Sequence, residues 1–136
     1  MMNLEPNRRA LMVDDSRVIR AIVGRAMQEL GFETEEAGDG QGALDKLRQG
    51  PSPCVMLIDW NMPNLNGLEL VRAVRANPEW SEVRMIMITS ENEIDRVQTA
   101  LEAGADEYIM KPFTKDMIQE KLTLLGITIP SLVGKV

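Results

Sequence analysis

Histidine is absent from this 136-residue sequence, and cysteine occurs only once, at Cys54. The absence of histidine excludes a histidine base, an imidazole metal ligand and a phosphohistidine within the chain. Cys54 lies inside an apolar run, where a thiol usually packs as a small hydrophobic side chain. The cysteine content therefore agrees with a reducing cytoplasm.

Basic residues are in the minority, since 15 lysines and arginines stand against 21 acidic residues, which gives a formal net charge of −6. Such a chain lacks the basic surface that neutralises nucleic-acid phosphates. Long apolar runs are also missing: the longest fall far short of the ~20 residues of a membrane span. The N-terminal segment with Glu5, Arg8 and Arg9 has no apolar core of a signal peptide. We expect a cytoplasmic protein without membrane insertion or direct nucleic-acid binding.

The chain length fits one domain of ordinary size, and no linker or internal repeat interrupts it. We expect a single domain over residues 1–136, with a core at about 9–125 and a C-terminal tail at 126–136. The apolar residues of the tail are expected to pack against the domain itself, with a partner surface as the alternative. They are Ile127, Ile129, Leu132 and Val133.

Short apolar runs alternate with helix-like segments along the chain. The alternation predicts an α/β fold with a five-stranded parallel sheet and right-handed crossovers. The strand segments are residues 10–13, 33–37, 54–58, 85–88 and 108–110, of which 33–37 is polar enough for a sheet edge. The helix segments are residues 16–30, 41–49, 67–76, a segment from Ser90 to Gly104, and about 115–125.

Two of these helices have specific sequence signals. In the first, Ile19, Val23, Met27 and Leu30 share one face, with Val18, Ile22 and Ala26 beside it. In the fourth, Ser90 and Glu93 have the spacing of a capping box. An apolar stripe follows this box, formed by Ile94, Val97 and Leu101.

Four of the predicted strands lead directly into a polar residue that can handle phosphate or metal. These residues are Asp14 and Asp15, Asp59, Thr89, and Lys111. Because ligands bind at the carboxyl ends of parallel strands, we expect the five side chains to converge. Three carboxylates close together repel one another, and oxygen ligands without histidine or cysteine suit Mg²⁺. The sequence therefore predicts a magnesium site.

Asp59 stands alone at its strand end and is the best candidate for a nucleophile that accepts a phosphoryl group. Lys111 is positioned to pair with a phosphoryl oxygen, and the Thr89 hydroxyl to donate a hydrogen bond to another. Each of these residues alone is compatible with a structural role, such as a helix cap. Their joint order along the strands favours the functional interpretation.

The motifs Asp14-Asp-Ser16, Asp59-Trp-Asn-Met-Pro63, Thr89-Ser90 and Lys111-Pro-Phe113, with Tyr108, resemble the receiver domain of two-component response regulators. The likeness covers roughly residues 9–125 and is greatest to the stand-alone chemotaxis type. It implies a flavodoxin-like doubly wound (βα)5 sandwich with strand order 2-1-3-4-5.

The resemblance also implies roles for individual residues. Asp59 would be the phosphoacceptor, and Asp15, Asp59 and the backbone carbonyl of Asn61 would bind Mg²⁺, with Asp14 acting mostly through water. Thr89 and Tyr108 would form a switch pair. Lys111 would contact the phosphoryl group and form a cis peptide bond with Pro112.

The implied partners are a sensor histidine kinase or phosphotransfer protein and a downstream protein that binds the face around Tyr108. We expect a monomer that is a signalling switch, not an enzyme, and that catalyses only its own phosphorylation and dephosphorylation. The segment after Thr89 is acidic, with Glu91, Glu93 and Asp95, whereas motor-binding relatives tend to carry lysines there. Chemotaxis is therefore one interpretation and a phosphate sink or relay another. A small metal-dependent phosphohydrolase is less favoured, because no substrate cap is present.

Overall fold

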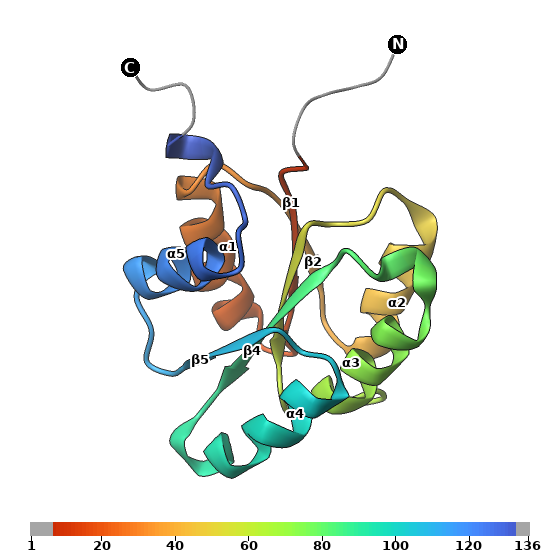
Figure 1. The fold of residues 1–136 in the computed structure, drawn as a ribbon. Coiled ribbons are helices and arrows are strands. Elements are labelled where there is room, and N and C mark those ends of the chain that lie inside the picture. Colours follow the sequence, from red (N-terminus) through yellow and green to blue (C-terminus); the bar gives the residue numbers. More distant parts are fainter. Residues whose placement is uncertain (1–6, 133–136) are drawn as a thin grey trace.

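The chain folds around a five-stranded parallel sheet in the order β2-β1-β3-β4-β5, and the computed structural model describes residues 7–132 (Figure 1). The order is the flavodoxin-like one implied by the resemblance, and this prediction is confirmed. The strands are β1 (Arg9–Val13), β2 (Glu33–Ala37), β3 (Val55–Asp59), β4 (Arg84–Thr89) and β5 (Glu107–Met110).

Helices cover both faces of the sheet: α1 and α5 lie on one side, and α2, α3 and α4 on the other (Figure 1). Their bounds are α1 (Arg17–Glu29), α2 (Gly40–Gln49), α3 (Gly67–Ala76), α4 (Val97–Ala103) and α5 (Lys115–Leu124). Short 3-10 segments are η1 (Pro78–Trp80), η2 (Glu91–Arg96) and η3 (Pro130–Leu132). Among the described residues, no helix is both long enough and apolar enough to cross a membrane.

The central strand β3 is buried along its whole length, because helices pack on both of its faces. Its side chains alternate between the two layers: Met56 and Ile58 belong to the core under α2 and α3. Val55 and Leu57 belong to the core under α1 and α5. By contrast, β2 lies at one edge of the sheet and is mostly polar, as its sequence predicted.

Strands β3 and β4 each extend one residue beyond the predicted segment at the carboxyl end, where the site is expected. β3 includes Asp59 and β4 includes Thr89 as their last residues, where the prediction ended one residue earlier. Both side chains are therefore placed by sheet hydrogen bonding and not by a following loop. At the other end, β3 begins at Val55, so Cys54 lies just before the strand and is only half-buried.

Helix α1 begins after Ser16, whose hydroxyl oxygen accepts a hydrogen bond from the Ile19 amide at 3.2 Å. Of the predicted face, Val23, Met27 and Leu30 are buried and Ile19 is partly buried. Val18 and Ile22, which the prediction set beside that face, are instead 67% and 51% exposed. The apolar stripe of α1 is thus wider than the surface that the sheet covers.

The fourth predicted helix is wrong in its first half. The segment after Ser90 forms η2, and the α-helix begins only at Val97. Val97 and Ala100 supply the buried contacts, whereas Ile94 and Leu101 of the predicted stripe are each more than a third exposed. A 3-10 segment has three residues per turn, so a stripe read at 3.6-residue spacing does not stay on one face.

The described part of the tail packs against the domain. Ile129 is 6% exposed and joins the core beneath α1 and α5, together with the partly buried Ile127. The Ser131 amide donates a hydrogen bond to the Leu30 carbonyl oxygen at 2.9 Å. Leu132 is 54% exposed, against expectation, and Val133 lies outside the described residues.

Candidate metal and phosphoryl site

Three carboxylates meet where β1 and β3 end. Asp14, Asp15 and Asp59 each offer an oxygen, and these oxygens all lie within 4.8 Å of one another. Asp14 and Asp59 are buried, at 4% and 7% exposure, whereas Asp15 is exposed. The predicted acidic cluster is therefore present, with two carboxylates in the interior and one at its mouth.

Asp14 is held in place by its neighbours along the chain. Its Oδ1 accepts a hydrogen bond from the Ser16 amide at 2.8 Å, and the Arg20 guanidinium donates to its carbonyl oxygen at 2.6 Å. Its Oδ2 is buried and has no hydrogen-bond partner. A buried carboxylate oxygen without a donor is costly, and a cation supplies what this oxygen lacks.

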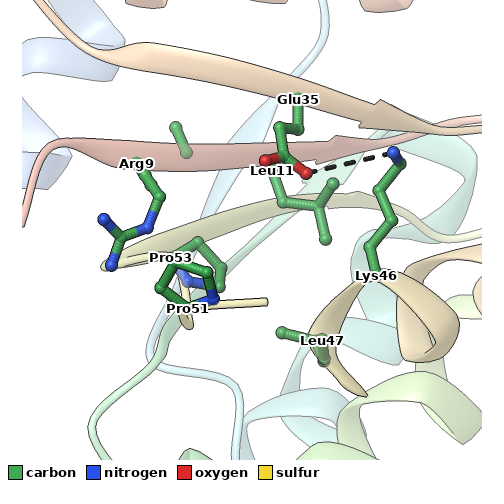
Figure 2. Close-up of a pocket in the computed structure, with 8 residues that line it drawn as sticks. Arg9, Leu11, Glu35, Lys46, Leu47, Pro51 and Pro53 are labelled. Atoms are coloured by element: carbon green, nitrogen blue, oxygen red, sulfur yellow. Dashed lines mark ion pairs between the residues drawn. The ribbon is translucent and has the colours of Figure 1, made fainter. Parts of the chain in front are cut away.

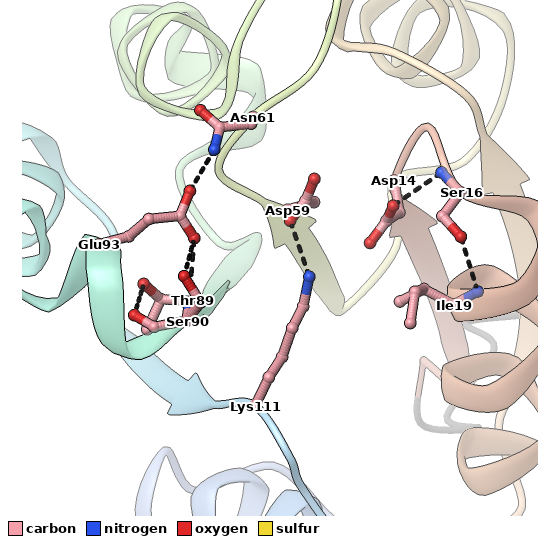
Figure 3. Close-up of polar contacts among 9 residues, drawn as sticks. All are labelled: Asp14, Ser16, Ile19, Asp59, Asn61, Thr89, Ser90, Glu93 and Lys111. Carbon is pink, nitrogen blue, oxygen red and sulfur yellow. Dashed lines mark hydrogen bonds and ion pairs between the residues drawn. The ribbon is translucent and has the colours of Figure 1, made fainter.

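Asp59 is joined to β5 by an ion pair, because the Lys111 ammonium lies 3.3 Å from its Oδ1 (Figure 3). Burial, reinforced by the negative charge of Asp14, nonetheless raises the pKa of Asp59 to about 6. Burial also raises the pKa of Asp14. The single positive charge of Lys111 thus does not offset the effects of burial and of the neighbouring carboxylates on the pKa of Asp59.

The residues fit a hard divalent cation. The side chains that meet here offer carboxylate oxygens, one of them buried without a partner, and the described cluster contains neither histidine nor cysteine. This donor set suits Mg²⁺ better than zinc or copper, which prefer nitrogen or sulfur.

Thr89 and Lys111 come from the last two strands. Thr89 is fully buried, and its hydroxyl donates to the carbonyl oxygen of its own neighbour, Ser90, at 3.3 Å (Figure 3). The Lys111 amide donates to the Thr89 carbonyl oxygen at 2.7 Å, which aligns the ends of β4 and β5. The Lys111-Pro112 bond is cis, as the resemblance implied.

Tyr108 lies on β5, separated from β3 and Asp59 by β4, and is partly buried. The Lys121 ammonium lies 4.9 Å from the centre of its ring and also pairs with Glu107 at 3.1 Å. The ring packs against the core on the face covered by α2, α3 and α4, while Lys121 of α5 reaches it from the other side of the sheet.

Glu93 was not predicted as a site residue, yet it reaches the loop that follows β3. Its carboxylate accepts hydrogen bonds from the Asn61 side-chain amide and from Ser90 (Figure 3). Asn61 itself is exposed, two residues beyond Asp59. The Ser90-Glu93 spacing was the only sequence signal; it was interpreted as a capping box, and that box is present. The contact with Asn61 joins residues 32 apart, which no local pattern reveals.

A hollow at the opposite edge of the sheet offers no rival site. Leu11, Leu47 and Pro51 line it, and the Glu35-Lys46 ion pair at 3.9 Å crosses its rim (Figure 2). Its volume of about 10 Å³ is at most that of one water molecule. This hollow is therefore too small to hold a ligand larger than water.

A parallel sheet in the order 2-1-3-4-5, with an aspartate cluster at the ends of β1 and β3 and a lysine at the end of β5, defines the class of response regulator receiver domains. The family model described as "Response regulator receiver domain" matches residues 10–123, and the chain belongs to this family.

The chain is similar to stand-alone chemotaxis proteins. It is 44% identical over 116 residues to chemotaxis protein CheY1 of Helicobacter pylori, a match that covers 85% of this chain and 94% of that protein. It is 43% identical over 113 residues to the CheY homolog of Campylobacter jejuni, covering 82% and 87% of the two chains. Among solved structures, chemotaxis response regulator CheY4 of Vibrio cholerae matches with a TM-score of 0.80 at 33% identity, covering 88% of this chain and 98% of that one.

Proposed function

We propose that this protein is a response regulator that accepts a phosphoryl group on Asp59 in a Mg²⁺-dependent reaction and thereby changes its affinity for a protein partner. The observation that supports the proposal best is the position of Asp59. It is buried next to Asp14 and Asp15 and is paired with Lys111.

The reaction follows from this arrangement. An Asp59 carboxylate oxygen attacks phosphorus and forms a new P–O bond, while the bond between phosphorus and the donor breaks. With acetyl phosphate as the donor, acetate leaves; with a phosphohistidine, the P–N bond breaks and the imidazole nitrogen takes the electron pair. Lys111 pairs with the charge of the transferred group. When bound by Asp14, Asp15, Asp59 and the Asn61 carbonyl, Mg²⁺ supplies charge neutralisation for the phosphoryl oxygens.

Thr89 and Tyr108 would carry the signal outward. The Thr89 hydroxyl leaves the Ser90 carbonyl and donates to the phosphoryl group, and the Tyr108 ring turns inward behind it. A difference of a few kcal/mol between the two states is enough to change the population of a switch.

The partners of this switch would be a sensor histidine kinase or phosphotransfer protein on one side and a downstream target on the other. The target would bind the face around Tyr108. The similarity to chemotaxis proteins supports a role in chemotaxis. The protein would act as a cytoplasmic monomer and catalyse only its own phosphorylation and dephosphorylation.

Mass spectrometry after incubation with acetyl phosphate and Mg²⁺ tests the proposal. We expect one added phosphoryl group per wild-type chain, none on Asp59→Asn, and little without Mg²⁺. Asp45→Asn, which changes an exposed aspartate on α2, should behave as wild type. Failure of the wild type to react with acetyl phosphate or any other phosphodonor would contradict the proposal. Continuous turnover of phosphoesters would instead favour a phosphohydrolase.

A phosphate sink or relay is the second candidate, and the acidic surface after Thr89 favours it. Glu91 and Asp95 are exposed there, so the surface differs from the lysine-rich one expected for motor binding. A pull-down with and without beryllofluoride, a mimic of the phosphoryl group, separates the two. Capture of a target only with beryllofluoride supports the output role; capture of kinases or phosphotransfer proteins alone supports the sink.

A further inference from the structure

Glu93 is a buried carboxylate outside the acidic cluster, and every contact it makes connects parts of the site. It is 9% exposed and lies in the middle of η2. Its Oε1 accepts hydrogen bonds from the Ser90 amide at 3.1 Å and from the Ser90 hydroxyl at 2.9 Å. Its Oε2 accepts a hydrogen bond from the Asn61 side chain.

These contacts form one chain of hydrogen bonds across the site. The chain begins at Asn61 in the loop after β3, passes through Glu93 to Ser90, and ends at the Thr89 hydroxyl, which donates to the Ser90 carbonyl oxygen (Figure 3). Thr89, whose hydroxyl would move on phosphorylation, is thus connected through Ser90 and Glu93 to the loop that follows Asp59.

We propose that Glu93 is a positioning residue that holds the segment after Thr89 in the unphosphorylated arrangement and so opposes phosphorylation of Asp59. The proposal rests on the proposed function and adds to it a residue that sets the resting position of the switch. For Thr89 to reach a phosphoryl group, its hydroxyl must leave the Ser90 carbonyl. Because both the amide and the hydroxyl of Ser90 are bound to Glu93, the backbone of Ser90 resists this movement.

The direction of the effect follows from which state gains the hydrogen bonds. Bonds to a charged group are stronger than neutral ones, and these are present in the unphosphorylated protein. Their loss therefore destabilises the resting state more than the phosphorylated state. Removing Glu93 should shift the equilibrium towards the phosphorylated arrangement by about tenfold, the effect of one such bond.

A titration with beryllofluoride at saturating Mg²⁺ measures this shift, with Trp60 fluorescence as the signal. Trp60 follows Asp59, and its ring centre lies 6.0 Å from the guanidinium carbon of Arg96, the last residue of η2. The probe therefore reports both the site and the segment. We expect Glu93→Ala to reach half-saturation at about one tenth of the wild-type beryllofluoride concentration and to react faster with acetyl phosphate.

Asp95→Ala is the matched control, because it removes the same charge from an exposed position in the same segment. It should bind beryllofluoride as the wild type does. Glu93→Gln keeps the size of the side chain and should also bind more tightly than the wild type, so it decides the question if Glu93→Ala folds poorly.

Tighter binding separates the proposal from a merely structural role, because a loss of folding would weaken binding. Unchanged or weaker binding by the folded Glu93 variants would overturn the role of Glu93 and leave the proposed function intact. Failure of the wild type itself to bind beryllofluoride would instead count against the proposed function.

Discussion

Asp59 is a carboxylate that the fold removes almost completely from water. It is buried beside Asp14, and the single ammonium of Lys111 does not offset the combined cost of burial and repulsion, which leaves its pKa at about 6. A carboxylate held at such a cost is poorly suited to a structural role. This cost falls when a cation binds, which links metal binding to stability.

Asp59→Asn should therefore stabilise the metal-free protein at neutral pH. The pKa of Asp59 is raised from 3.8 to about 6, so the folded state binds more protons than the unfolded state between these values. The stability of the wild type thus falls as pH rises from about 4 to about 6, and the loss is complete above that range. We expect the variant to be more stable by about 2 kcal/mol at pH 7.5.

Urea unfolding in the presence of a chelator, at pH 7.5 and at pH 4, measures this effect. The difference between the two proteins should shrink at pH 4, where Asp59 is protonated in the folded wild type, and again on addition of Mg²⁺ at pH 7.5. Equal stabilities at pH 7.5 without metal would show that the carboxylate is not destabilised.

Sequence patterns predicted the residues of the acidic cluster because each follows a strand directly. Asp14, Asp15 and Asp59 occupy strand ends, and the geometry of a parallel sheet brings such ends together. Glu93 could not be found in this way, since its contact with Asn61 depends on how η2 lies against the loop after β3. Local spacing contains no information on that.

At the scale of elements, η2 and α4 show where helical periodicity fails. The residues after Ser90 were expected to form one helix, and the capping box between Ser90 and Glu93 is present, but the segment that it opens is η2 and the α-helix begins only at Val97. The same box between Asn66 and Glu69 opens a regular α-helix, α3. A capping box therefore marks where a helical segment begins, and does not decide whether its first turns are 3-10 or α.

Arg75 connects α3 to two other segments of the fold, the one between η1 and β4 and the one between α4 and β5. Its guanidinium donates to the carbonyl oxygens of Gly104 and Val83 at 2.9 and 2.6 Å, and to Asp106 at 2.8 Å. Arg75→Leu removes the guanidinium donor from the two carbonyl oxygens and leaves Asp106 with only the Met85 amide and the Arg84 ion pair, so it should destabilise the protein by about 3 kcal/mol.

Arg72→Leu is the matched control for this prediction, because Arg72 is exposed on the same helix. Chemical denaturation of both variants gives the comparison, and Arg72→Leu should change stability by less than about 0.5 kcal/mol. Similar losses in the two variants would mean that the contacts of Arg75 contribute nothing specific.

At the scale of the whole molecule, the two apolar layers stabilise the sheet independently of the site. Ile129 is buried in the layer beneath α1 and α5, far along the sheet from the ends of β1 and β3. Ile129→Ala should cost about 2–4 kcal/mol, the usual effect of removing a buried isoleucine side chain. The rate of phosphorylation by acetyl phosphate should not change.

Thermal unfolding and phosphorylation assays on the same samples check this separation. Leu132→Ala, at a position that is 54% exposed, should leave both measurements near the wild-type values. A slower phosphorylation of folded Ile129→Ala would show that the tail influences the site, contrary to expectation.

The described chain begins and ends at the same edge of the sheet. Arg9 opens β1, and Ser131 bonds to Leu30 just beyond the end of α1, both at the edge opposite the carboxyl ends of the strands (Figure 1). A surface linkage or a reporter attached at Arg9 or Ser131 would therefore lie at the end of the sheet opposite Asp59. Immobilised protein should keep the edge of the sheet that contains Asp59 accessible. The rates at which either partner binds can therefore be measured with the protein attached to a surface.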